Sequence, residues 1–348
     1  MINVRYIIDI LPSISEDLNR IVTSGKYQTV QDFIRVAIEN QVYLESQEIQ
    51  GLDSAPSTTA GNTVVTLTSQ RKKSSDFLHL RPGMSRARTV PISNCERPSY
   101  IWGQYNKFLP VKVVTRVAAN LLVEHGTELL PLSELQETAA DAARELGKML
   151  QRSDVAMGRK RGAILSAALP VGREQEKAKR RFETQFVGYI VKNRMEGAAP
   201  TLKFVEVRRD TNGSTSIGLT DFGLKFATIS NPVLDGTTFE TPLSEEEGEF
   251  LLRHISNELP EEAKMMQYIL TKIREGVDTP EALNKGLGTD FLNDGWQDNE
   301  IIAMRSGLVS RLSELGLLTR QKEGVNVTYA LTTRGEEYLT SALTREVP

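Results

Sequence analysis

Residues 217–226 read IGLTDFGLKF, and residues 329–338 read YALTTRGEEY. The two stretches share a leucine, a threonine, a glycine and an aromatic residue at a constant offset of 112 residues. The matching pairs are Leu219 and Leu331, Thr220 and Thr332, Gly223 and Gly335, and Phe226 and Tyr338. Four matches at one offset indicate an internal repeat, in which the same supersecondary unit occurs twice.

The segments before each copy carry the same order of signals. Residues 202–207 precede a turn at 211–213, and residues 317–321 precede a turn at 322–324, so each copy predicts a β-hairpin. An amphipathic helix is expected before each hairpin. The helix, the two-stranded wing and the strand-LT-x-x-G-helix ending resemble the winged-helix fold of many DNA-binding regulators. The resemblance implies that the two threonines cap a closing helix and that the two glycines let this helix approach the wing.

We therefore predict two winged-helix domains, at residues 105–232 and 240–345. Further helices with apolar stripes are expected upstream of each hairpin. These helices cover residues 111–124, 133–150, 245–259 and 261–275, and another starts at 278–280. Apolar residues at helical spacing are typical of core-facing helices rather than of cofactor-binding motifs.

The amino-terminal residues form a separate unit with clear boundaries. Residues 4–10 are an extended run, Ser13 and Glu16 have capping-box spacing for a first helix, and Thr29 caps a second. One strand has no partner within this unit, so we expect a second copy to supply it in an obligate homodimer through residues 3–44. The segment YIIDILPSISEDLNRIVTSGKYQTVQDFIRVAI resembles the ribbon-helix-helix domain of many small bacterial and archaeal repressors and antitoxins.

In this ribbon, Arg5, Ile7 and Asp9 face outward if the alternate, apolar positions face the helices. The resemblance implies that the outward residues contact base edges in the major groove. Arg5 suits that role and Ile7 can touch a thymine methyl group, whereas Asp9 can accept only from a cytosine amino group. The family's phosphate contact at the start of the second helix falls on Thr29 and Val30, whose backbone amides are available for it. Base reading by the ribbon and simple dimerisation therefore both remain open.

The expected fold class is mainly α with small β elements. It consists of a ribbon-helix-helix domain at residues 1–45, a largely irregular linker at 46–104 and the two winged-helix domains. The linker contains stretches such as SAPSTTAGNT and RPGMSRAR, which have few apolar residues at a fixed period. Several domains are also expected from the length of 348 residues, which exceeds what one core usually serves.

The charges are unevenly distributed along the chain. The whole sequence has 42 Lys and Arg against 45 Asp and Glu, a net charge of -3. Residues 151–209 alone contain 14 basic and 6 acidic residues, a net of +8, so the remainder carries -11. An average near neutrality argues against nucleic-acid binding, but a local excess of this size is typical of a surface that contacts phosphates.

The helix predicted before the first wing spans residues 175–194. Its apolar side carries Ala178, Phe182, Phe186, Tyr189 and Ile190. Its opposite side is basic, and the wing adds two more cations. The candidate contacts to double-stranded DNA are Lys177, Arg180, Arg181, Thr184, Lys192, Arg208 and Arg209. We expect the cations to contact phosphates and Thr184 to reach a base.

The corresponding helix of the second copy, residues 299–315, predicts a different surface. The residues expected to face outward are Glu300, Ala303, Ser306, Gly307, Ser310 and Glu314. Because glutamates repel phosphates and small side chains permit close helix packing, this face favours a protein partner over DNA. A second dimer interface is one such contact.

Catalytic residue types are scarce. The chain has one cysteine, Cys95, and three histidines, which excludes an intramolecular disulfide and a cysteine-rich zinc site. We therefore expect no metal, no cofactor and no enzymatic activity. Glu206 and Glu262 each stand two residues before a cation, as in half of a nuclease carboxylate-lysine pair, but are interpreted as surface charges. His254 lies in an apolar helix and is interpreted as part of the packing.

These patterns favour a homodimeric, sequence-specific DNA-binding protein, such as a transcriptional regulator, in the cytoplasm. Neither a signal peptide nor an apolar stretch long enough to span a membrane is expected. The alternative is a protein-interaction adaptor in a defence, partition or toxin-antitoxin complex, in which the winged helices bind protein. No membrane partner is expected in either case.

Overall fold

A computed structural model describes residues 73–160, 162–192, 194–210, 212–236, 239–290 and 295–345. The predicted ribbon-helix-helix domain, with Arg5, Ile7 and Thr29, lies outside the described residues, as does the linker up to residue 72. The described part of the chain is mainly α-helical with small antiparallel sheets, as the sequence predicts.

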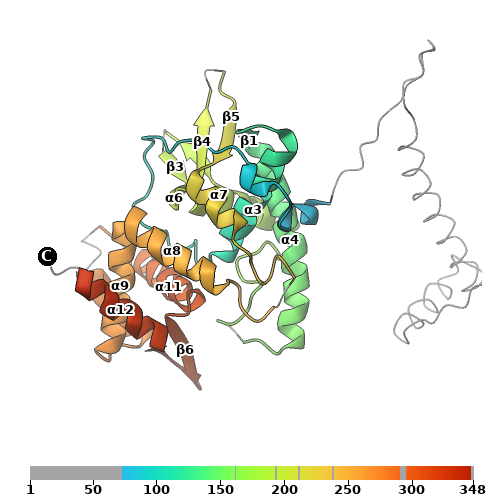
Figure 1. The fold of residues 1–348 in the computed structure, drawn as a ribbon. Coiled ribbons are helices and arrows are strands. Elements are labelled where there is room, and N and C mark those ends of the chain that lie inside the picture. The colour runs from blue at the N-terminus through green and yellow to red at the C-terminus, as the bar shows by residue number, and fades with distance from the viewer. Residues whose placement is uncertain are drawn as a thin grey trace, which may run out of the picture. The chain divides into compact units, whose positions relative to one another are not determined.

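Residues 105–232, called the first repeat, contain two long helices and a small three-stranded sheet. Its elements are α3 (Leu109–His125), β1 (Leu130–Pro131), α4 (Leu132–Ala156), α5 (Gln175–Phe182), the π-helical turn η3 (Glu183–Val187), β2 (Tyr189–Val191), β3 (Arg194–Glu196), α6 (Ala198–Thr201), β4 (Val205–Arg209), β5 (Thr215–Leu219) and α7 (Asp221–Thr228). The sheet order is β1-β5-β4, and both pairings are antiparallel. Helix α3 packs against α4 and α7 (Figure 1). The two predicted upstream helices are confirmed as α3 and α4, each slightly longer than expected.

The helix predicted over residues 175–194 is shorter in the structure. It ends at Val187, and Tyr189 and Ile190, which were expected on its buried side, lie in β2. Gly188 has a φ of 107°, and a Cβ at this position would overlap the Pro200 ring and a backbone carbonyl. Only glycine fits this close approach, which turns the chain out of the helix.

Residues 240–345, called the second repeat, follow the predicted order of helices. Its elements are α8 (Glu245–Glu258), α9 (Pro260–Arg274), α10 (Pro280–Asp290), α11 (Asp298–Glu314), β6 (Leu318–Glu323), β7 (Asn326–Leu331) and α12 (Thr333–Arg345). Ser244 and Glu247 form a capping box at the start of α8. The hairpins β4–β5 and β6–β7 project from opposite ends of the described molecule (Figure 1).

The two repeats end with the same hydrogen bonds. Thr220 Oγ1 accepts from Gly223 N at 3.1 Å and donates to the Lys203 carbonyl at 2.6 Å. Thr332 Oγ1 accepts from Gly335 N at 3.0 Å and donates to the Gly316 carbonyl at 2.6 Å. A Cβ on either Gly223 or Gly335 would overlap a backbone carbonyl oxygen at the start of the hairpin. The predicted capping role of both threonines and the predicted close approach at both glycines are therefore confirmed.

The segment before the first repeat is irregular but closely packed. It contains the short 3-10 helices η1 (Ser74–Leu78) and η2 (Met84–Arg86). Phe77, Met84 and Ile101 are at most 6% exposed, and all belong to the main core. Sequence patterning did not reveal this packing because the apolar residues follow no fixed period.

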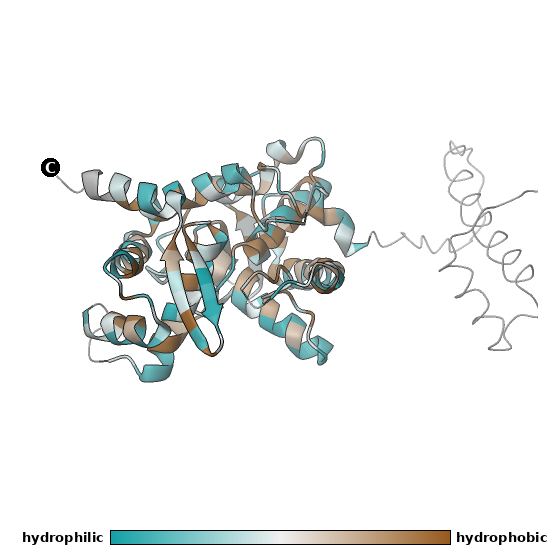
Figure 2. Cartoon of the chain, turned by 90° about the horizontal axis from the view of Figure 1, so that it is seen from below, coloured by the Kyte–Doolittle hydropathy of each residue, from teal (hydrophilic) through white to brown (hydrophobic). Residues whose placement is uncertain are grey.

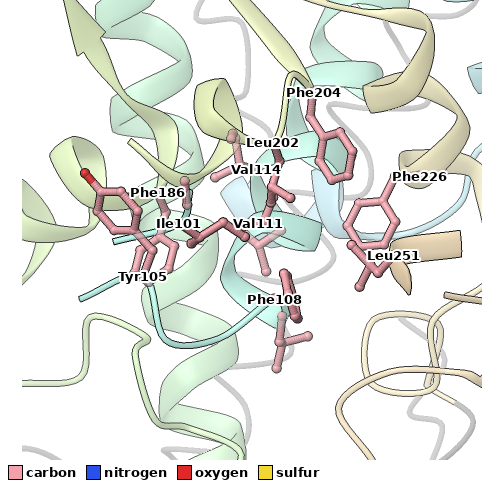
Figure 3. Close-up of a cluster of buried hydrophobic side chains, with 14 of the residues drawn as sticks. Ile101, Tyr105, Phe108, Val111, Val114, Phe186, Leu202, Phe204, Phe226 and Leu251 are labelled. Carbon is pink, nitrogen blue, oxygen red and sulfur yellow. The ribbon is translucent and has the colours of Figure 1, made fainter. Parts of the chain in front are cut away.

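One hydrophobic core runs through both repeats. In the hydropathy-coloured cartoon, the hydrophobic segments gather in the interior of the described part of the chain (Figure 2). Phe226 of the first repeat lies beside Leu251 of α8 (Figure 3), and its ring stacks on Phe250 with a centroid distance of 5.7 Å. The described residues of both repeats belong to one compact body. None of the described helices is long and apolar enough to cross a membrane.

One buried ion pair joins the two repeats, and a second one, within the second repeat, binds the segment at 101–105. Lys112 of α3 lies 2.8 Å from Glu247 of α8, and both side chains are fully buried. Arg311 of α11 donates to Glu262 of α9 at 2.7 and 3.0 Å and to three carbonyls in residues 101–105. Glu262 also accepts from Ile101 N at 3.0 Å. The Arg311–Glu262 pair therefore fixes the segment at 101–105 against the second repeat, because a buried charge is tolerated only with partners.

Candidate nucleic-acid interface

The basic helix α5 is held against α4 by one ion pair and by aromatic packing. Lys179 Nζ lies 2.7 Å from Asp141 Oδ1, and this hydrogen bond raises the pKa of Lys179. Phe182 and Phe186 point into the core, with ring centroids 5.3 Å apart. This docking leaves Lys177, Arg180 and Arg181 exposed, as the sequence predicts. Lys177 lies 3.5 Å from Glu174, which is exposed as well.

Thr184 does not extend freely from this surface. Its Oγ1 lies 3.0 Å from the Arg180 carbonyl and 3.1 Å from the Arg181 carbonyl, to which it donates. The residue is only partly exposed. Its hydroxyl hydrogen is therefore occupied by the preceding turn, which leaves an acceptor rather than a donor for a base.

Lys192 lies in the two-residue turn of the hairpin β2–β3. Its φ is 48°, which is left-handed backbone, and its side chain is exposed. Met195 anchors the hairpin: the residue is fully buried, and Val207 N donates to its sulfur at 3.4 Å. The hairpin therefore presents Lys192 from beside β4, whereas the sequence predicts this residue at the end of a helix.

The hairpin β4–β5 carries Arg208 and Arg209 close to its tip. Asp210 shapes the tip by accepting from Asn212 N at 3.0 Å and from Ser214 N at 2.8 Å. Arg209 is exposed, and Arg208 is partly exposed and donates to the Pro91 carbonyl at 3.5 Å. The hairpin β4–β5 therefore holds two cations close to its tip.

The interpretation of Glu206 and Glu262 as surface charges is wrong. Glu206 is fully buried, 2.6 Å from Arg97 and 2.7 Å from the Ser93 hydroxyl. Glu262 is buried beneath Arg311, as described above. The distant partners lie in the irregular segment and in α11, so no local pattern could reveal these pairs.

Ion pairing separates the basic residues of 151–209 into two groups. Five have a carboxylate partner: Arg159 with Asp154, Lys177 with Glu174, Lys179 with Asp141, Arg194 with Glu196, and Lys203 with Glu258. Five of the predicted DNA contacts have none among the described residues: Arg180, Arg181, Lys192, Arg208 and Arg209. Five of the six cations singled out from the sequence thus lack a neutralising partner in the described chain, and so do Arg152, Lys160 and Arg173, which were not singled out.

The structure distributes these five cations over three elements rather than over one helix face. Arg180 and Arg181 lie on α5, Lys192 on the β2–β3 turn, and the remaining two on β4. Strands β3 and β4 are neighbours (Figure 1), linked by the contact of Met195 with Val207. Among the described residues, no hydrogen bond or ion pair connects the α5 arginines with either hairpin. The helix directly before the first wing is α6, which has four residues, all buried.

The outward face predicted for α11 is partly covered by the same chain. Gly307 packs against the backbone of Gly103 so closely that a Cβ on either would overlap the other segment. Glu314 accepts from Phe108 N at 2.6 Å and Leu109 N at 3.3 Å, and burial raises the pKa of Glu314. The small and acidic residues thus serve an intramolecular contact at the start of α3. A partner protein cannot reach this side of α11 while the contact is present.

His254 is part of the packing, as predicted. It is 4% exposed, its Nε2 lies 2.6 Å from the Leu202 carbonyl, and its ring stacks on Phe250. Among the described residues, no group of His, Cys, Asp and Glu side chains could hold a metal ion. Comparisons of the chain with protein-family models, with curated proteins and with solved structures found no match.

Proposed function

We propose that this protein is a homodimeric, cytoplasmic DNA-binding protein that acts as a transcriptional regulator. Phosphate contacts come mainly from the first repeat, and the two chains pair through residues 3–44. The observation that carries the proposal is the division of the basic residues. Cations needed to hold the fold have carboxylate partners, whereas Arg180, Arg181, Lys192, Arg208 and Arg209 remain available for phosphates.

The fold assignment within the proposal is a pair of winged helices after a ribbon-helix-helix domain. Support for the winged helices comes from the identical threonine caps and from the glycine approach at the end of both hairpins. In the first repeat, the order helix, strand, helix, hairpin and closing helix supports it further. Support for the ribbon-helix-helix domain rests on the sequence of residues 3–44.

The first repeat departs from a helix-centred mode of DNA reading. Its helix before the wing is short and buried, so exposed cations on α5 and on two hairpins are left to make the contacts. Such a surface neutralises phosphates, and it reads bases poorly. Sequence preference then depends on Thr184, on the wing and on Arg5 and Ile7 of the amino-terminal ribbon.

The test is a fluorescence-anisotropy titration of a labelled random-sequence duplex with the full chain at several salt concentrations. Arg180→Ala combined with Arg181→Ala should weaken binding to every duplex. It should also flatten the slope of log K against log salt by about 0.9 for each phosphate that is no longer neutralised. A control variant, Arg253→Ala with Arg274→Ala, removes the same charge from exposed sites of the second repeat and should leave the slope unchanged.

Two results would contradict the proposal. One is the absence of duplex binding at low salt. The other is an equal loss of duplex affinity in the α5 variant and in the control variant. Binding would then depend on the net charge of the protein and not on a defined basic surface. Stoichiometric copurification of a protein, insensitive to the α5 variant and without duplex binding, would favour the adaptor in a defence, partition or toxin-antitoxin complex.

A further inference from the structure

A groove of about 450 Å³ lies between α11 and the hairpin β6–β7, and none of the predicted DNA-contacting cations lines it. Its third wall comes from residues 106–107 and 162–167 of the first repeat. The size is within the range of about 300–1,000 Å³ that small-molecule sites occupy. The groove thus forms only because the two repeats pack together.

Three cations line this groove, and none of the described lining residues is a carboxylate. They are Lys107, Arg305 and Arg320, each partly buried. Arg305 is oriented by two neutral groups: its Nε donates to Asn284 at 3.0 Å, and an Nη donates to the Tyr329 hydroxyl at 3.2 Å. No ion pair neutralises any of the three among the described residues.

A carboxylate close to Lys107, that of Glu314, already has hydrogen-bond partners. Glu314 lies close enough to Lys107 for their attraction to lower the pKa of Glu314, against the larger effect of burial. Its carboxyl group accepts from two backbone amides at the start of α3. Even with this carboxylate counted, the groove has an excess of positive charge.

The floor of the groove adds hydroxyl groups and an apolar strip. Ser306, Ser310 and Ser313 follow each other on one face of α11, and their hydroxyls bond to no other described residue. Ile302, Val309 and Val327 provide apolar surface beside them. Guanidinium and hydroxyl donors match the several acceptor oxygens of a phosphate, and the apolar strip suits an organic group.

We propose that this groove binds a small organic phosphate, a monoester of about nucleotide size. The phosphate contacts Lys107, Arg305 and Arg320, and the organic group lies along α11. A DNA duplex fits less well, because the floor is recessed between the hairpin and residues 162–167. The proposal does not depend on DNA binding by the first repeat. A ligand in this groove contacts both repeats. Its binding can therefore favour one arrangement of the two repeats over another.

The experiment is isothermal titration calorimetry of the full chain at low ionic strength. The probes are adenosine 5′-monophosphate, pyrophosphate and inorganic phosphate, with adenosine as the phosphate-free control. We expect saturable binding of at least one phosphate probe and none of adenosine. Lys107→Gln combined with Arg320→Gln should weaken that binding at least tenfold, and neither side chain has an ion-pair partner in the described chain whose loss would unfold it.

A matched control is Arg253→Gln with Arg274→Gln, which removes the same charge outside the groove and should keep the affinity within twofold. Ser310→Trp fills the floor without changing charge and should also abolish binding. The proposal is wrong if no phosphate probe binds saturably, or if the groove and control variants lose the same affinity. It is also wrong if the groove variant weakens only duplex DNA binding, since the groove would then be a nucleic-acid contact.

Discussion

Replacing Arg311 by methionine tests what holds the segment at 101–105 against the second repeat. The guanidinium is fully buried and donates to Glu262 at 2.7 and 3.0 Å. It also donates to the carbonyls of Ile101, Trp102 and Tyr105 at 3.0 to 3.4 Å. Methionine retains much of the volume but none of these donors. The variant therefore leaves a buried carboxylate with only the Ile101 amide as a partner.

The expected cost is large for a single substitution. Removing one member of a buried ion pair destabilises a protein by about 3–5 kcal/mol, because the remaining charge is buried without compensation. Glu262→Gln removes that uncompensated charge, and buried pairs replaced as a whole by well-packed apolar residues often lose little stability. The double variant Arg311→Met with Glu262→Gln should therefore be more stable than Arg311→Met alone. This order of stabilities does not follow if each residue contributes independently.

Urea denaturation followed by tryptophan fluorescence measures these differences. The two tryptophans of the chain, Trp102 and Trp296, lie beside this site with ring centroids 5.3 Å apart, so their emission reports its local integrity. The matched control is Arg274→Met, an exposed arginine of α9 without an ion-pair partner in the described chain. The reasoning is refuted if Arg311→Met lowers the free energy of unfolding by less than about 1 kcal/mol, or if the double variant is less stable than Arg311→Met alone.

Two further predictions concern the repeat and the buried histidine. Gly223→Ala and Gly335→Ala should each lower the free energy of unfolding by about 1–3 kcal/mol, because a Cβ at either position overlaps a backbone carbonyl. The control is Gly295→Ala, where a Cβ meets open space, and it should be nearly neutral in the same urea titration. Burial lowers the pKa of His254 in the folded chain below its ordinary value of 6.5. Because the unfolded chain then binds the proton more readily, the folded state loses stability as the pH falls below about 6.5. His254→Gln should reduce the slope of unfolding free energy against pH between pH 7 and 5, and an unchanged slope would show that another group titrates there.

Local patterns explain why much of the fold could be predicted. Apolar residues at helical spacing placed α3, α4, α8, α9 and α11 close to their observed bounds. The helix predicted over 175–194 is too long because the helical spacing of apolar residues continues past Gly188. In the structure it is the residue that permits the approach of Pro200 and ends the helix. A single glycine gives no sequence signal that separates a helix end from a helix interior.

The candidate site was predictable in composition but not in arrangement. The excess of basic residues over 151–209 is visible in the sequence, and the exposed arginines of α5 follow from helical spacing. Which cations are neutralised depends on partners far along the chain, such as Glu258 for Lys203. The groove beside α11 likewise brings residues 106–107 together with Arg305 and Arg320, which lie about two hundred positions further along the chain.

By itself, the sequence determined that this protein is mainly helical and ends two segments with the same capped turn. Those features depend on contacts within a few residues: a threonine hydroxyl, an amide three positions later and a glycine beside a hairpin. Only the tertiary structure decided that Glu206 and Glu262 are buried, that one side of α11 is covered, and that three cations without an ion-pair partner in the described chain share a groove. The physical reason is that charge is compensated in space and not along the chain.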